Sequence, residues 1–312
     1  MIDTQELIVR HKDNPIFERD TIAGYDTLFN PGGIRYRDRL ILVVRAARHD
    51  RWLAAVTERS KIYAGQICDH LLFESTDEGE TWQFTGFKIT GSAANWLDGC
   101  TGELAVPTYF GPYGTEDARL CEMGDQIVGI AHVLTHEPYR GDHKAGGRVG
   151  LILTKDLRHF DRYLVGPGRE ETDRDALIVE TDRGIAFIHR IKPDAAGRRK
   201  LKAPSIQVAF FGSLDDLIHA PPSYWDDHLQ SIHEHEILAP ARGLAWESHQ
   251  VGANSLLAHD AGWLLFYHGV SEDREYAASH EPTFRMSICS SMRSCAPRSR
   301  ALLADAIVAK EG

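Results

Sequence analysis

The feature that most constrains the fold is a series of short, β-prone segments separated by turn residues. Val, Ile, Leu and aromatic residues dominate each segment, and Gly, Pro, Asp or Asn borders it. Such segments are typical of strands joined by turns. They cover residues 40–45, 126–133, 184–190, 207–211 and 262–268. Helical periodicity is limited to two short stretches, near 48–60 and 225–235, so we expect one all-β domain.

A weak internal repeat groups these segments into units. In each unit a small polar or acidic residue is followed, fourteen or fifteen residues later, by an Arg or His at the end of a strand. The pairs are Asn30 with Arg45, Asp117 with His132, Asp175 with Arg190, and Asn254 with His268. Strand-built repeats are typical of propeller blades, whose inner strands line a central channel. We therefore predict that these side chains converge on one pocket. The alternative is four ordinary hairpins whose polar ends face solvent.

A second recurring element is an S-x-D-x-G-x-T-W box at residues 75–82, with looser versions at 154–160 and 213–217. The Asp can accept hydrogen bonds from the backbone N–H groups of a turn, and the Gly supplies a positive φ. The aromatic residue can pack beneath the turn. We interpret the box as a structural element of hairpin blades.

Composition excludes several classes of partner. The 35 Lys and Arg residues against 45 Asp and Glu give a net charge of −10, whereas nucleic acids and anionic membranes select a basic face. No apolar run approaches the roughly 20 residues of a membrane helix, and no apolar leader begins the chain, so we expect a cytoplasmic protein. Five cysteines without a CxxC pair do not indicate a zinc ribbon or disulfide framework. His233 and His235 alternate in a polar stretch, and we expect no metal and no organic cofactor.

The carboxylates are the first candidates for chemistry. Glu116 and Asp117 are adjacent, with Arg119 two residues further on. An acid beside an Arg is often only an ion pair, but Asp117 occupies the repeat position that we expect to face the channel. Glycoside cleavage requires an acid at the glycosidic oxygen and a nucleophile or base on the other side of the ring. Asp175 and Glu247 are the other acids near repeat starts, and either could be structural.

Nine segments, in their order along residues 11–280, resemble glycoside hydrolase family 130. That family comprises β-mannoside phosphorylases and related β-mannosidases on a five-bladed β-propeller. The segments are DNPIF, FNPGG, LILVVR, GTEDAR, LTKDLRHF, DRDALIV, FIHRIKP, WESHQVGANSLL and GWLLFYHGV. Each is short, but the order is specific.

The resemblance implies roles for individual residues. Asp117 would be the general acid of an inverting mechanism, and Asn30 and Arg45 would hold the mannosyl unit. Arg190 and His268 would line a pocket for inorganic phosphate, with His189 beside them. Two further substrate-binding candidates occupy the remaining repeat starts, Asp175 and Asn254. An oligosaccharide is the expected partner, and a homo-oligomer is left open.

The sequence also departs from the family pattern. Gln250 stands where phosphorylases of the family usually carry a Lys, which removes one cation from the implied phosphate pocket. Water would need a base in place of phosphate, and Glu247 is the candidate. Residues 286–300 are rich in Ser, Arg and Cys, unlike the body of the chain. We therefore predict a propeller domain over 1–285 with an incomplete or loosely ordered last blade, and a divergent tail over 286–312.

Three functions compete at this point. The first is cleavage of β-mannosides with inversion, by phosphorolysis to α-mannose 1-phosphate or, alternatively, by hydrolysis. The second is a sialidase, which the S-x-D-x-G-x-T-W box favours, but no FRIP-like segment opens the chain. The third is a carbohydrate-binding propeller without catalysis, which the missing Lys and the altered C-terminal segment favour.

Overall fold

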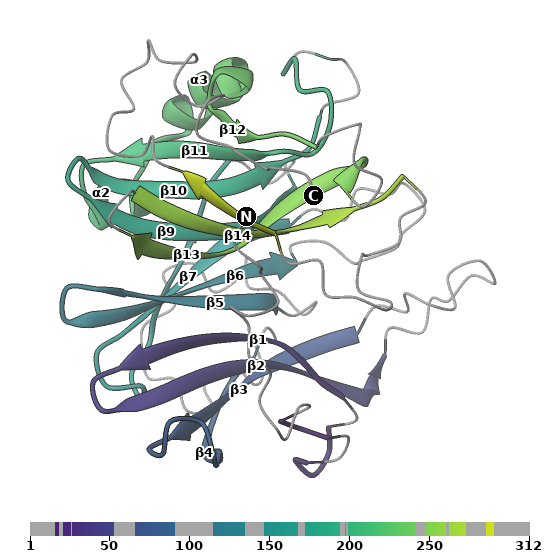
Figure 1. The fold of residues 1–312 in the computed structure, drawn as a ribbon, viewed down its shortest axis with the longest axis vertical. Coiled ribbons are helices and arrows are strands. Elements are labelled where there is room, and N and C mark those ends of the chain that lie inside the picture. The colour runs from purple at the N-terminus through teal and green to yellow at the C-terminus, as the bar shows by residue number, and fades with distance from the viewer. Residues whose placement is uncertain are drawn as a thin grey trace, which may run out of the picture.

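The computed structural model describes residues 16–18, 21–25, 27–52, 66–90, 115–134, 147–167, 172–193, 197, 199–240, 247–259, 262–272 and 285–289. Within these ranges the chain is built mainly of antiparallel strands, arranged as successive sheets (Figure 1). All further statements about the structure concern this part of the chain.

Four sheets follow one another in sequence order, and each is a simple up-and-down meander. The first contains β1 (Thr27–Tyr36), β2 (Arg39–Trp52), β3 (Gln66–Ser75) and β4 (Gln83–Thr90). The second contains β5 (Thr115–Met123), β6 (Gln126–Leu134), β7 (Gly147–Thr154) and β8 (Asp161–Val165). The third contains β9 (Asp173–Thr181), β10 (Gly184–Ile191), β11 (Ile206–Phe211) and β12 (Glu236–Leu238). The fourth contains β13 (Gln250–His259), β14 (Gly262–Val270) and β15 (Arg285–Cys289).

The first strands of successive sheets lie next to one another: β1 beside β5, β5 beside β9, and β9 beside β13 (Figure 1). Each sheet is therefore a propeller blade whose first strand is the innermost one. The predicted fold class, an all-β, five-bladed β-propeller, is confirmed. The described residues form four of the five blades. Residues 290–312 lie outside them, so the incomplete last blade and the domain boundary at 285 stay predictions.

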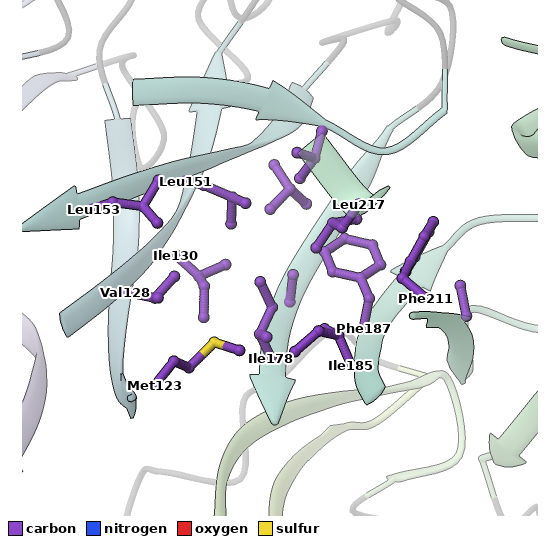
Figure 2. Close-up of a cluster of buried hydrophobic side chains, with 14 of the residues drawn as sticks. Met123, Val128, Ile130, Leu151, Leu153, Ile178, Ile185, Phe187, Phe211 and Leu217 are labelled. Atoms are coloured by element: carbon purple, nitrogen blue, oxygen red, sulfur yellow. The ribbon is translucent and has the colours of Figure 1, made fainter. Parts of the chain in front are cut away.

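Apolar side chains from the facing sides of neighbouring blades form the core. Between the second and third blades, Ile130 and Leu151 meet Ile178 and Phe187, all at most 3 % exposed (Figure 2). Neighbouring strand residues point to opposite faces, so Ile188 packs instead toward the fourth blade. Each fully buried side chain of this size contributes about 1.5–3 kcal/mol. The blades are thus held rigidly enough to place the side chains at their inner edge.

The internal repeat corresponds to a recurring β-bulge. Asn30, Asp117, Asp175 and Asn254 each lie where the pairing register shifts between the first and second strand of a blade. The first three also have a positive φ, between 46° and 51°. Asn and Asp tolerate this left-handed conformation better than most residues, because their short polar side chains bond locally. A bulge at the inner strand re-aims its side chain, which explains why the same residue types recur there.

All five β-prone segments lie in strands, β2, β6, β10, β11 and β14. The helical stretch near 225–235 is confirmed by α3 (Pro222–Ser231) and the 3₁₀ turn η1 (Ile232–Glu234). The prediction of a helix near 48–60 is wrong over residues 48–52. These residues continue β2, and Trp52 still pairs with Gln66 of β3. Residues 53–60 lie outside the described part of the chain.

The predicted turn boxes at 75–82 and 213–217 adopt different structures. At 75–82, Asp77 accepts hydrogen bonds from the Ser75 hydroxyl and the Thr81 backbone N–H, at 2.7 and 2.9 Å, and Gly79 has a φ of 89°. The structural role is confirmed there. At 213–217 the segment is instead a helix start, because the Ser213 hydroxyl accepts from the Asp216 backbone N–H and caps α2 (Leu214–Ile218).

Candidate active site

Asp117 lies at the bulge of β5, at the inner edge of the second blade. Its Oδ1 atom accepts a hydrogen bond from the Asn30 side-chain amide at 2.8 Å and another from Nη1 of Arg45 at 3.0 Å. Both partners belong to the first blade, so the contacts span two neighbouring inner strands. The Asp117 side chain keeps 27 % of its surface exposed, which leaves the carboxylate accessible to a ligand.

The guanidinium of Arg45 has a hydrogen-bond partner at each of its three nitrogens. Nη2 donates to Oε1 of Glu116 at 2.6 Å, Nε donates to Sγ of Cys68 at 3.2 Å, and the guanidinium lies 4.7 Å above the Phe29 ring. With Nη1 on Asp117, every nitrogen of the planar fork is engaged. Arg45 therefore positions the carboxylate of Asp117, and its role in holding a sugar stays a prediction.

Asp175, at the bulge of β9, joins three of the four blades. Its Oδ1 accepts from Nη2 of Arg119 at 3.1 Å, and its Oδ2 lies 2.8 Å from Nη2 of Arg190 and 3.9 Å from Nε2 of His268. Arg119 also donates to the backbone carbonyl of Asp117 at 3.0 Å. A continuous chain of polar contacts thus connects Asn30 and Asp117 to Arg190 and His268.

Arg190 is a buried cation with unused donors. Its side chain is 5 % exposed, and among the described residues its Nε and Nη1 have no hydrogen-bond partner. Buried guanidinium groups are normally satisfied by carboxylates, phosphates or carbonyls. The two nitrogens mark the place in this cluster where an anion would complete the hydrogen bonding.

His268 is fixed by Asn254. Its Nδ1 lies 2.9 Å from Oδ1 of Asn254, an oxygen that can only accept, so Nδ1 carries the proton. Burial lowers the pKa of His268, and Arg190 lowers it further against the opposing effect of Asp175. In neutral His268, Nε2 is then the ring nitrogen that can accept a hydrogen bond. Gly252, paired with His268 across the ladder, makes room: a Cβ there would lie 2.4 Å from Oδ2 of Asp175.

The two central carboxylates are held in their ionised forms. Burial alone would raise the pKa of Asp117, but Arg45, the Asn30 amide and Arg119 together bring it below its ordinary value. The same balance holds at Asp175, where Arg190 and Arg119 outweigh burial and lower the pKa far more strongly. At neutral pH the cluster contains two carboxylates among several arginines.

His189 and Glu247 do not join this cluster through the contacts seen here. His189 is fully buried on the other side of β10, with Nδ1 on Oδ2 of Asp173 at 2.9 Å and Nε2 on Nε2 of His228 at 3.0 Å. Both ring nitrogens are engaged, so the geometry does not support direct phosphate binding by His189. Glu247 is 2 % exposed and accepts a hydrogen bond from the Tyr267 hydroxyl at 3.0 Å. A role as base stays a prediction.

Two arginines and one glutamate belong to the cluster although the repeat pattern did not select them. Arg119 bridges Asp117 and Asp175, while Nη1 of Arg174 lies 3.6 Å from Oε2 of Glu116. Glu116 and Arg174 directly precede the bulge residues Asp117 and Asp175, and each pairs with a residue of the second strand of its own blade. Their position beside Asp117 and Asp175 in the sequence is the signal that could have found them.

Among the described residues no group of three or more His, Cys, Asp or Glu side chains is arranged to hold a metal ion. Within the same residues, no helix has the length and apolarity required to span a bilayer.

Comparisons with known proteins agree with this architecture. No family model matches the chain. A curated β-1,2-mannobiose phosphorylase from Listeria innocua is 26% identical over 167 residues, which are 53% of this chain and 39% of the relative. The chain thus spans less than half the length of that relative. The predicted resemblance to glycoside hydrolase family 130 is confirmed.

The solved structures match a larger share of the chain. The Listeria innocua β-1,2-mannobiose phosphorylase in complex with β-1,2-mannobiose superposes with a TM-score of 0.59 at 16% identity, covering 89% of this chain and 78% of that one. A candidate glycosidase from Bacteroides thetaiotaomicron gives 0.56 at 15% identity, covering 89% and 76%. At such identities these structures establish the fold, and the roles of individual residues rest on the geometry above.

Proposed function

We propose that the protein is a carbohydrate-active enzyme of the family 130 type that cleaves β-mannosides with inversion, by phosphorolysis to α-mannose 1-phosphate. The observation that carries the proposal is the joining of Asp117 and Arg190 in one cluster. An accessible carboxylate lies at one end of the cluster. At the other lies a buried guanidinium, two of whose nitrogens have no hydrogen-bond partner among the described residues. A general acid and an anion site are the two elements that phosphorolysis requires.

Asp117 supplies the proton in this proposal. The bond between the anomeric carbon and the glycosidic oxygen breaks, and the oxygen takes a proton from the Asp117 carboxyl, directly or through a sugar hydroxyl. Asn30 and Arg45 fix the carboxyl group through their contacts with Oδ1. The proton of the attacking hydrogen phosphate restores the acid, so the reaction is balanced.

Phosphate is the nucleophile from the opposite side of the ring. Its oxygens can accept from the Nε and Nη1 groups of Arg190, and its P–OH group can donate to Nε2 of His268. A bond between one phosphate oxygen and the anomeric carbon forms as the glycosidic bond breaks, which inverts the configuration. The Asp175 carboxylate keeps the Arg190 guanidinium in place between turnovers.

The charges also explain how an ionised Asp117 becomes an acid. Arg45 and Arg119 lower the pKa of Asp117 in the unliganded protein. A phosphate dianion in the same cluster offsets those cations, and a nearby negative charge raises the pKa of a carboxyl group. Phosphate binding therefore favours the protonated, active form of Asp117.

The test is product analysis on β-1,2- and β-1,4-mannobiose, with and without inorganic phosphate. The proposal expects cleavage only with phosphate, and α-mannose 1-phosphate as the first product. Free mannose released at the same rate in phosphate-free buffer would make the protein a hydrolase, the alternative that Gln250 favours, and Glu247 would be the first base to replace. Binding of mannosides without any cleavage would make it a carbohydrate-binding propeller.

A further inference from the structure

The helical segment between β11 and β12 has no part in the chemistry described so far. Pro222 begins α3, where its fixed φ suits the first turn, and Trp225 and His228 lie one turn apart on the buried face. Both are 5 % exposed and pack against the third blade. Because the surroundings are mainly apolar, a histidine at this position calls for a specific polar partner.

That partner is His189 of β10. The two Nε2 atoms are 3.0 Å apart, and the rings are stacked with their centroids at 5.2 Å. Burial, together with His189 and His235, lowers the pKa of His228 to about 2, so His228 is neutral. One of the two Nε2 atoms then donates and the other accepts, which fixes the tautomers of both rings.

His189 in turn holds Asp173, the first residue of β9. Oδ2 of Asp173 accepts from Nδ1 of His189 at 2.9 Å, and Oδ1 accepts from the backbone N–H of Arg190 at 3.2 Å. The backbone carbonyl of Asp173 also lies 2.9 Å from Nδ1 of His132 in the second blade. Asp173 is 2 % exposed, so these bonds are shielded from water.

The bond to the Arg190 backbone matters because of where it occurs. The register of β10 against β9 shifts between Ile188 and Arg190, so the regular ladder does not by itself define the backbone at that point. The Asp173 carboxylate provides a fixed acceptor there instead. The direction of the Arg190 side chain follows from that backbone.

We propose that His228, His189 and Asp173 form a positioning chain through which α3 holds Arg190 in the orientation that binds phosphate. The three are positioning residues, since none of them needs to touch the ligand. The inference rests on the proposed phosphorolysis and goes beyond it, because it gives α3 and the buried histidine pair a role in selecting the anion.

The experiment compares phosphate binding by calorimetry, and KM for phosphate against kcat, in four full-length variants. His228→Phe keeps an aromatic ring but cannot hydrogen-bond, and Asp173→Asn removes the charge next to Arg190. His228→Gln restores a polar group at the same place. His219→Gln, at an exposed histidine that follows α2, is the matched control.

We expect His228→Phe and Asp173→Asn to weaken phosphate binding and raise KM for phosphate about tenfold or more, with kcat at saturating phosphate nearly unchanged. His228→Gln should recover part of the affinity, and His219→Gln should match the wild type. Unchanged phosphate affinity in folded His228→Phe and Asp173→Asn would overturn the positioning chain alone. Absence of phosphate binding in the wild type would overturn both this inference and the proposed phosphorolysis. If His228→Phe fails to fold, the Asp173→Asn and His228→Gln pair decides in the same way.

Discussion

Replacing Asp175 by Asn tests whether the inner cluster depends on this one carboxylate. Its side chain is 9 % exposed and faces Nη2 of Arg119 at 3.1 Å and Nη2 of Arg190 at 2.8 Å. The amide has nearly the same shape, so packing is preserved while the charge is lost. The buried guanidinium of Arg190 and the half-buried one of Arg119 are then left without their shared counter-ion.

The expected cost follows from the burial of the pair. Removing one partner of a buried ion pair typically costs about 3–5 kcal/mol, because the remaining charge stays desolvated. Asn still accepts one hydrogen bond from Arg119, so we expect the lower end, about 3 kcal/mol. With a urea m-value of about 3 kcal/mol per molar, the midpoint of unfolding falls by about 1 M.

The assay is urea unfolding followed by fluorescence, with Asp125→Asn as the matched control. Asp125 also faces a cation, Nζ of Lys155 at 2.8 Å, but 76 % of its side chain is exposed. Exposed pairs contribute little, so the control should show no measurable change. Inorganic phosphate should recover part of the stability lost in Asp175→Asn, because it supplies negative charge to Arg190.

The pH dependence provides an internal check. The folded protein holds the pKa of Asp175 far below its ordinary value of about 3.9, so this carboxylate stabilises the fold above that pH. Its contribution disappears as the pH falls, and the wild type and the variant should converge in acid. Equal unfolding midpoints for Asp175→Asn and Asp125→Asn at pH 7 would refute the reasoning.

Two further predictions concern Asp117. Asp117→Asn should lower kcat by about 10²–10⁴-fold or more, because the amide cannot donate an acidic proton. Little stability should be lost, because the amide oxygen still accepts hydrogen bonds from Asn30 and Arg45. Near-normal kinetics on β-1,2-mannobiose would eliminate Asp117 as the acid. The acid must be protonated, so activity is lost as the pH rises through its pKa. Bound phosphate raises that pKa, and the alkaline limb of the rate profile should therefore lie at higher pH with saturating phosphate than at low phosphate. If the alkaline limb does not move with phosphate concentration, the pKa of Asp117 does not depend on bound phosphate and this prediction is refuted.

Strands and their inner edge could be predicted from the sequence because both depend on local chemistry. A β-prone run bordered by Gly or Asp forms a strand in almost any all-β context, as 184–190 does in β10. The spacing from Asp175 to Arg190 spans one hairpin, whose bulge brings the two ends together. The repeat therefore indicated that Asn30, Asp117, Arg190 and His268 all lie at the inner edge of the propeller.

Contacts between blades could not be predicted in this way. Arg45 meets Asp117 across 72 residues, and Arg119 meets Asp175 across 56. No local pattern encodes which of several carboxylates a guanidinium selects, because that choice depends on how the inner strands align. The role of Arg45 as a support for Asp117 follows only from that alignment.

His189 illustrates the limit most clearly. Its position next to Arg190 suggested a shared pocket, but successive strand residues point to opposite faces, so its ring meets Asp173 and His228 instead. The partner comes from α3, 39 residues further along the chain. The sequence by itself determined which residues reach the inner edge of the propeller. The tertiary structure decided which of them face the cluster and which, like His189, lie on the opposite face of their strand. Blade packing and the α3 contact, on which this depends, arise only in the folded chain.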